Sequence, residues 1–71
     1  MKGLFLRSIE KKEKIVIIYM DQYERVTQRY VRVIRMDEHT IMAYCYWRKK
    51  IRMFTKQNIL SAGPIQKKLG A

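Results

Sequence analysis

The sequence predicts a mainly β domain in which a short N-terminal helix precedes a small five-stranded Sm/SH3-like barrel. Two observations predict this class. Apolar residues recur with helical spacing only near the N-terminus. Beyond that segment, β-branched and apolar runs of strand length alternate with short polar turns. A barrel is expected because closure protects the edges of so short a sheet.

The helix is expected over residues 2–13, where Phe5 and Ile9 lie on one side. The first strand, 14–20, is apolar on both faces, so neither face should be fully wet. In the second strand, 26–36, the alternation slips, which predicts a bend or a bulge. The remaining strands are expected over 40–47, 50–55 and 57–61.

Residues 1–62 are expected to form this single domain, and residues 63–71 a loosely held basic tail. Gly63-Pro64 is the expected end of regular structure, because proline lacks the N–H group that a strand donates. A chain of 71 residues leaves little room for an enclosed active-site cavity. An enzyme is therefore not expected.

Charge is the most extreme feature of the composition: sixteen Lys and Arg against six Asp and Glu give a net charge of +10. All six acidic residues precede His39, so the second half of the chain carries cations alone. A polyanionic partner would explain this, because neutralised phosphates release counterions. Solubility of a small protein is the other explanation.

Cys45 is the single cysteine and lies in an apolar run, so we expect a small buried hydrophobe. One cysteine permits neither an internal disulfide nor a multi-cysteine metal site. The N-terminal apolar run, Leu4 to Leu6, is too short for a signal peptide or a membrane span. A cytoplasmic protein is the expectation.

Four segments carry a family resemblance. The apolar run 15–19 ends in tyrosine, and Arg29 follows inside the next strand. The third segment, 41–45, reads Ile-Met-Ala-Tyr-Cys, and the fourth is Arg52-Met53-Phe54 with Asn58-Ile59 behind it. Together, over roughly residues 4–62, they resemble the WYL domain, a small barrel preceded by a helix.

Two positions depart from the family pattern. His39-Thr40-Ile41 stands where the Trp-Tyr-Leu triplet is expected, and the proline expected soon after Arg29 is missing. Family members are usually regulatory modules fused to a helix-turn-helix DNA-binding domain, and they sense nucleotide-like or nucleic-acid ligands. The resemblance implies a stand-alone, minimal bacterial relative in a transcription-regulatory context.

Five cations are the first candidates for an anion site. Arg29 and Arg52 would form a clamp if neighbouring strands brought their planar donor forks onto one surface. Arg48, Lys49 and Lys50 lie in a turn without Gly or Asn, so this turn should be longer or strained. Its charges suit phosphate contacts or simple hydration. For the arginine pair, the alternative is a salt bridge to an acidic residue, namely Asp21, Glu24, Asp37 or Glu38.

The aromatic residues of 41–47 divide between two faces. Strand alternation places Ile41, Ala43, Cys45 and Trp47 on one face and Met42, Tyr44 and Tyr46 on the other. Tyr46 or Trp47 would stack on an unpaired base, or Trp47 would cap the end of the barrel.

These features predict a non-catalytic module that binds an anionic ligand, either single-stranded nucleic acid or a nucleotide. No cofactor, metal or membrane partner is expected, since the sole histidine, His39, has no further ligands at metal-site spacing. One alternative is a homodimer or an adaptor for an acidic protein, docking through an exposed strand edge. Another is a small-molecule sensor.

Overall fold

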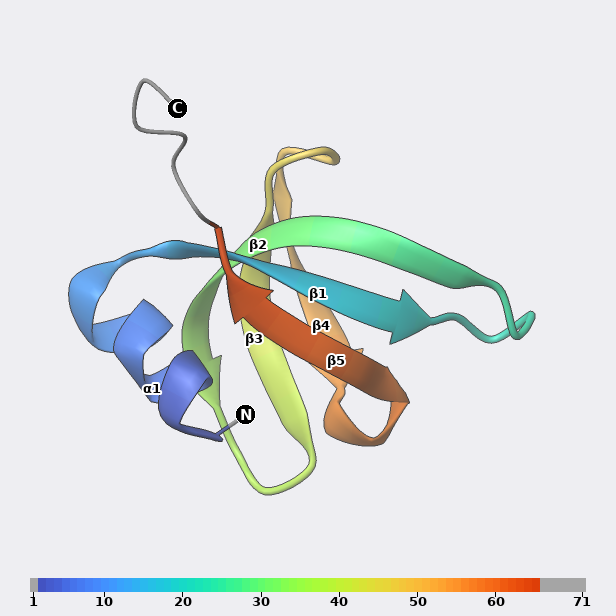
Figure 1. Cartoon of the computed structure of the whole chain (residues 1–71), viewed down its shortest axis with the longest axis horizontal. Helices are drawn as coiled ribbons and strands as arrows, with labels where there is room; N and C mark the ends of the chain where they lie inside the picture. The colour runs from blue at the N-terminus through green and yellow to red at the C-terminus, as the bar shows by residue number, and fades with distance from the viewer. Residues whose placement is uncertain (1, 66–71) are drawn as a thin grey trace.

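The computed structural model describes residues 2–65 and confirms the mainly β class, with one N-terminal helix and five antiparallel strands. Figure 1 shows these elements along the chain. Their bounds are α1 (Lys2–Lys11), β1 (Lys14–Met20), β2 (Val26–Met36), β3 (Thr40–Cys45), β4 (Lys50–Thr55), the 3₁₀ turn η1 (Lys56–Asn58) and β5 (Ile59–Pro64). No helix within the described residues is long and apolar enough to cross a membrane.

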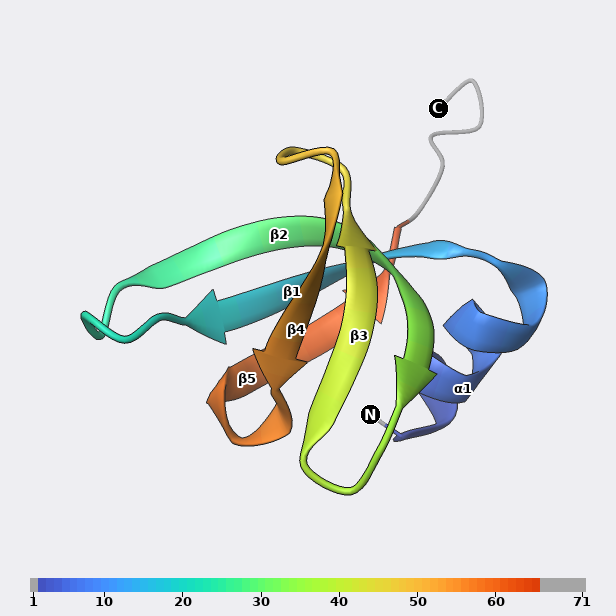
Figure 2. The same ribbon diagram turned by 180° about the vertical axis from the view of Figure 1, so that it is seen from behind.

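The strands form one sheet in the order β4-β3-β2-β1-β5. The long strand β2 belongs to both halves, because it pairs with β1 along Val26–Arg32 and with β3 along Val31–Met36. Figures 1 and 2 show the sheet curled so that β1 and β5 lie over β3 and β4. The edge strands β4 and β5 share no ladder within residues 2–65, so the barrel is open.

The predicted irregularity in β2 is a register shift in its pairing with β3, between Val33 and Arg35. An extra residue at this point lets a strand bend while its inward side chains stay in the core. Val31 and Val33 before the bulge are buried.

The core lies between the two halves of the curled sheet and beneath α1. Its buried apolar side chains are Phe5, Ile15, Ile17, Val31, Val33, Ile41, Ala43, Cys45, Phe54 and Ile59. Alternation explains the members of this set that come from β1, β2 and β3, since alternate residues of these strands point inward. Cys45 is buried, as predicted.

The helix ends two residues earlier than predicted. Lys12 adopts a left-handed conformation, with φ 55°, and the Glu13 N–H donates to the Ser8 carbonyl at 3.2 Å. This is the Schellman arrangement that terminates helices. Ser8 is itself buried, and its hydroxyl donates to the Glu13 carbonyl while accepting from the Val33 N–H. One side chain therefore joins α1 to β2.

Two strand ends also differ from the prediction. β3 stops at Cys45 because residues 46–49 form a four-residue turn, in which Lys49 has a φ of 57°. β5 runs to Pro64, which pairs with Ile15, so the last strand extends three residues beyond its predicted end at residue 61. β5 is an edge strand, where proline's missing N–H disrupts no second ladder. The predicted tail lies mostly in residues 66–71, outside the described part of the chain.

Candidate anion-binding site

Arg29 and Arg52 occupy inward-facing positions of the sheet. Arg29 on β2 is directly opposite Ile17, and Arg52 on β4 is directly opposite Ala43. Residues directly opposite each other in an antiparallel pair share a face. Because Ile17 and Ala43 are both fully buried, the two arginines point toward the inside of the barrel.

These two arginines line one solvent-open hollow of about 500 Å³, together with Arg48 from the turn after β3. We call it the arginine hollow. Its other lining residues are Tyr19, Asp21, Gln22, Tyr23, Met53, Phe54, Thr55 and Asn58. The lining thus carries three formal positive charges and one negative charge.

The floor of the arginine hollow includes an aromatic pair, Tyr19 and Phe54, whose rings meet edge to face at 5.0 Å. The Thr55 N–H donates to the Tyr19 hydroxyl at 3.4 Å, which links β4 to β1 across the open end of the barrel. The turn between β1 and β2 forms a further wall of the hollow. In Figure 1 this turn and α1 lie at opposite ends of the molecule.

The guanidinium of Arg29 is only partly satisfied. Its Nε donates to the Thr27 hydroxyl at 3.1 Å, whereas Nη1 is buried and has no hydrogen-bond partner in the described residues. Buried donors are nearly always paired, so an unpaired cationic N–H group in a hollow needs an explanation. A ligand oxygen at this place would supply the missing acceptor.

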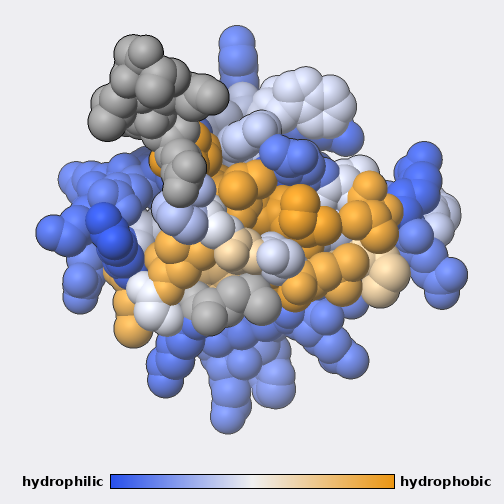
Figure 3. Space-filling view, in the orientation of Figure 1, coloured by the Kyte–Doolittle hydropathy of each residue, from blue (hydrophilic) through white to orange (hydrophobic). Residues whose placement is uncertain are grey.

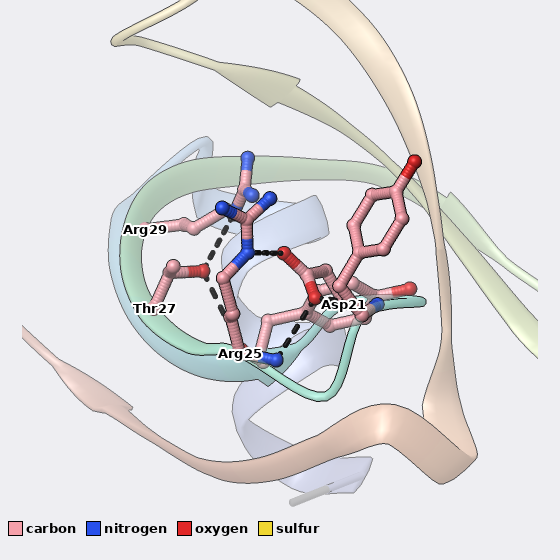
Figure 4. Close-up of polar contacts among 6 residues, drawn as sticks. Asp21, Arg25, Thr27 and Arg29 are labelled. Atoms are coloured by element: carbon pink, nitrogen blue, oxygen red, sulfur yellow. Dashed lines mark hydrogen bonds and ion pairs between the residues drawn. The ribbon is translucent and has the colours of Figure 1, made fainter.

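The one carboxylate of the hollow, Asp21, is engaged elsewhere. It accepts hydrogen bonds from the backbone N–H groups of Tyr23 and Arg25 and from the Arg25 side chain. Figure 4 shows Asp21 joined to Arg25 while Arg29 is joined to Thr27. The backbone hydrogen bond from Arg25 is the main cause that lowers the pKa of Asp21, so this group stays ionised.

The alternative reading, in which each arginine pairs with an acidic residue, is not what the structure has. The close contacts between basic and acidic side chains among the described residues are Arg7–Glu13, Arg25–Asp21 and His39–Glu38. None of them contains Arg29 or Arg52. The expectation that the two come from neighbouring strands is wrong, however, because β3 lies between β2 and β4. The curl of the sheet brings them together instead.

A second hollow adjoins the first. It has a volume of about 390 Å³ and is lined by Thr27, Gln28, Arg29, Tyr30, Cys45 and Trp47. We call it the tryptophan hollow, and Arg29 lines both hollows. Trp47 does not cap the barrel, because 79% of its surface is exposed; it lies at the rim, with the Arg48 guanidinium 5.3 Å from its ring.

The other predicted site residues lie apart from this pair of hollows. Tyr46 lines a third hollow with Lys14, whose ammonium is 4.3 Å from the Tyr46 ring centre. Lys49 in the turn and Lys50 at the start of β4 are exposed, and they line neither the arginine hollow nor the tryptophan hollow. The structure therefore brings Arg29, Arg48, Arg52 and Trp47 together and leaves the remaining three aside.

Two functional candidates were missed in the sequence. Thr27 orients Arg29, and Tyr19 forms part of the floor beneath it. The signal was present in the alternation, because Thr27 lies two residues before Arg29 and so faces the same way. Tyr19 is directly opposite Thr27, but this pairing requires the register of β1 and β2.

A solved structure resembles this chain over most of its length. The proteasome accessory factor B/C (PafBC) of Arthrobacter aurescens is similar to this chain with a TM-score of 0.78 and 22% sequence identity. The match covers 93% of this chain and 11% of PafBC, so the chain spans about a ninth of that protein's length. PafBC contains a WYL domain, and the likeness supports a WYL-like fold. No protein-family model and no curated protein matches the chain.

Proposed function

We propose that this protein is a non-catalytic binding module for an anionic ligand, single-stranded nucleic acid or a nucleotide. Phosphate oxygens occupy the arginine hollow, where Arg29, Arg48 and Arg52 supply the donors. The resemblance to the WYL domain adds a regulatory, cytoplasmic role, which is part of the same proposal.

One observation carries the proposal: the buried Nη1 of Arg29 has no partner among residues 2–65. A protein that used arginine only for solubility would hydrate the whole guanidinium at an outward position. At an inward position, the group gains from a ligand that accepts its free N–H in a two-bond geometry. The excess of positive charge in the hollow adds a long-range attraction for phosphate.

The test is fluorescence anisotropy of a labelled single-stranded oligonucleotide titrated with the full chain at several salt concentrations. Three neutralised phosphates predict a slope of log affinity against log salt of about −2 for a single strand. The double variant Arg29→Ala plus Arg52→Ala should bind far more weakly and reduce the slope to about −0.7. Binding that ignores salt would contradict the proposal.

A matched control separates the hollow from net charge. Arg32 and Arg35 lie on β2 opposite the partly buried Tyr44 and Met42, outside both hollows. The double variant Arg32→Ala plus Arg35→Ala removes the same charge. If both double variants remain folded and lose affinity equally, binding depends on total charge and not on the arginine hollow.

An interaction module is the second candidate, and one surface favours it. Figure 3 shows apolar surface crossing the side of the molecule on which β1 and β5 lie. Val26 and Leu60 are exposed by 57% and 49%, and β5 is an edge strand. A homodimer in light scattering that Val26→Lys plus Leu60→Lys dissociates, with no oligonucleotide binding by the parent, would favour this candidate.

A further inference from the structure

The two hollows differ in chemistry although they share a wall. The arginine hollow carries three guanidinium groups, whereas the tryptophan hollow is lined largely by the apolar parts of its side chains. Arg29 separates them and contributes to both. Arg48 makes a second link, because it lines the arginine hollow and also lies over the Trp47 ring. A ligand that fills both hollows must carry an anion next to an apolar group.

Aromatic side chains border the apolar part of this site. Trp47 and Tyr30 are exposed by 79% and 44%, and both line the tryptophan hollow. The Gln28 amide donates to the Tyr30 hydroxyl at 2.7 Å, which gives the tyrosine a defined position. Exposed, positioned rings beside a phosphate-binding surface are the arrangement on which nucleobases stack.

We propose that the tryptophan hollow binds an unpaired nucleobase against Trp47, while the adjacent phosphate is held in the arginine hollow. This inference rests on the proposed function and narrows it, since it names the ligand class as nucleic acid with exposed base faces. A base in a duplex is stacked on both sides and paired at its edge, so it cannot enter the hollow without leaving the stack. Inorganic phosphate and bare sugar-phosphate chains occupy only the arginine hollow.

Selectivity for single strands then follows from geometry and not from base-edge hydrogen bonds. Every base has a π face, so stacking on Trp47 discriminates weakly among the four bases. Stacking contributes about 1–3 kcal/mol per base, which corresponds to a factor of about 5 to 150 in affinity. The arginines supply the salt-dependent part of the affinity, and Trp47 supplies a part that salt hardly changes.

Trp47 is the only tryptophan of the chain, so its fluorescence reports on this hollow directly. The full chain is titrated with three probes of equal length, about eight nucleotides, which is within the site size of small barrels. The probes are single-stranded oligothymidylate, the same chain without bases, and a blunt duplex. End-label anisotropy gives affinity, and tryptophan fluorescence gives contact with the base.

We expect oligothymidylate to quench Trp47 and to bind at least about fivefold more tightly than the abasic chain. Trp47→Ala should weaken oligothymidylate binding by about 5- to 150-fold and leave abasic binding unchanged, whereas Trp47→Phe should retain most of the affinity. Because the Trp47 side chain is 79% exposed, neither Trp47→Ala nor Trp47→Phe should disturb the fold. The duplex should bind no better than the abasic chain.

Three results are decisive against the inference. If the abasic chain binds as tightly as oligothymidylate and Trp47→Ala changes neither, the base site is refuted while anion binding by the arginines stands. If the duplex binds as well as the single strand and quenches Trp47 equally, an unpaired base is not required. If neither single strand binds at low salt, the proposed function fails and this inference fails with it.

Discussion

Replacing Arg29 by methionine is expected to stabilise the ligand-free domain while it weakens anion binding. The side chain faces inward, opposite the buried Ile17, and its Nη1 is buried without a partner in the described chain. A buried donor left unpaired costs about 1–3 kcal/mol. Methionine keeps an apolar stem in the same place and removes the guanidinium.

The expected magnitude follows from two opposed contributions. The variant loses the hydrogen bond from Arg29 Nε to Thr27, which contributes about 1 kcal/mol. It removes the unpaired donor and the repulsion from Arg48 and Arg52, which line the same hollow. The net change is a stabilisation of about 1 kcal/mol, which raises Tm by about 4–8 °C in a domain of this size.

Thermal unfolding followed by far-UV circular dichroism measures this change, first without and then with inorganic phosphate. The parent should gain stability as phosphate is added, by about 2.7 kcal/mol at a hundred times Kd, and Arg29→Met should gain much less. Arg35→Met is the control, because Arg35 is an exposed arginine on the same strand. An Arg29→Met variant with a lower Tm than this control would show that the guanidinium supports the fold, and would refute the reasoning.

Three further predictions concern the fold. Ser8→Ala should lower the free energy of unfolding by about 2 kcal/mol in urea titrations, because the buried Val33 N–H loses the hydroxyl that accepts it. Lys12→Gly should raise the free energy of unfolding by about 0.5 kcal/mol, because the left-handed strain that glycine relieves at φ 55° exceeds the conformational entropy that glycine costs. The backbone hydrogen bond from Thr40 is the main cause that lowers the pKa of Asp37 below its ordinary 3.8. The ionised Asp37 carboxylate therefore stabilises the fold above pH 3.8, and this contribution is lost as the pH falls through the folded-state pKa of Asp37. Asp37→Asn removes the contribution, so it should flatten the dependence of Tm on pH in this acidic range.

Each of these predictions has a matched control. Ser61→Ala makes the same chemical change at an exposed position and should alter stability by less than about 0.5 kcal/mol. Lys11→Gly lies inside the last helical turn and should destabilise by about 1 kcal/mol, the opposite sign to the neighbouring substitution. Glu38→Gln removes an exposed carboxylate beside Asp37 and leaves the hydrogen bonds that Asp37 accepts from His39 and Thr40 in place. Equal effects of a substitution and its control would contradict the corresponding mechanism.

The β-branched and apolar runs predicted the strands well, because the composition of a run is a local property of the sequence. The bounds of β1, β2 and β4 agree with the predicted 14–20, 26–36 and 50–55. The end of α1 was missed because a lysine, not a glycine, adopts the left-handed position there. Likewise the last strand was predicted to end too early, at residue 61, because only the order of the strands reveals that β5 is an edge that tolerates Pro64.

The candidate site was less accessible because it depends on the curl of the sheet. Alternation alone gives two arginines in different strands, and it cannot say that β3 separates those strands. Alternation assigned Tyr46 and Trp47 to opposite faces, but it cannot say which hollow each of them lines. Their positions are set by the turn over residues 46–49, because strand alternation no longer holds after Cys45.

The faces on which the cations lie bear on the two explanations of the +10 charge. Cations that serve solubility belong at outward positions, where water hydrates them at little cost. Arg32 and Arg35, which lie opposite the partly buried Tyr44 and Met42, are in such positions. Arg29 and Arg52 are at inward positions, where a small barrel would otherwise place apolar side chains and gain stability from their burial. Solubility explains the outward arginines, but it does not explain why Arg29 and Arg52 face inward. Binding of an anionic ligand would explain their position.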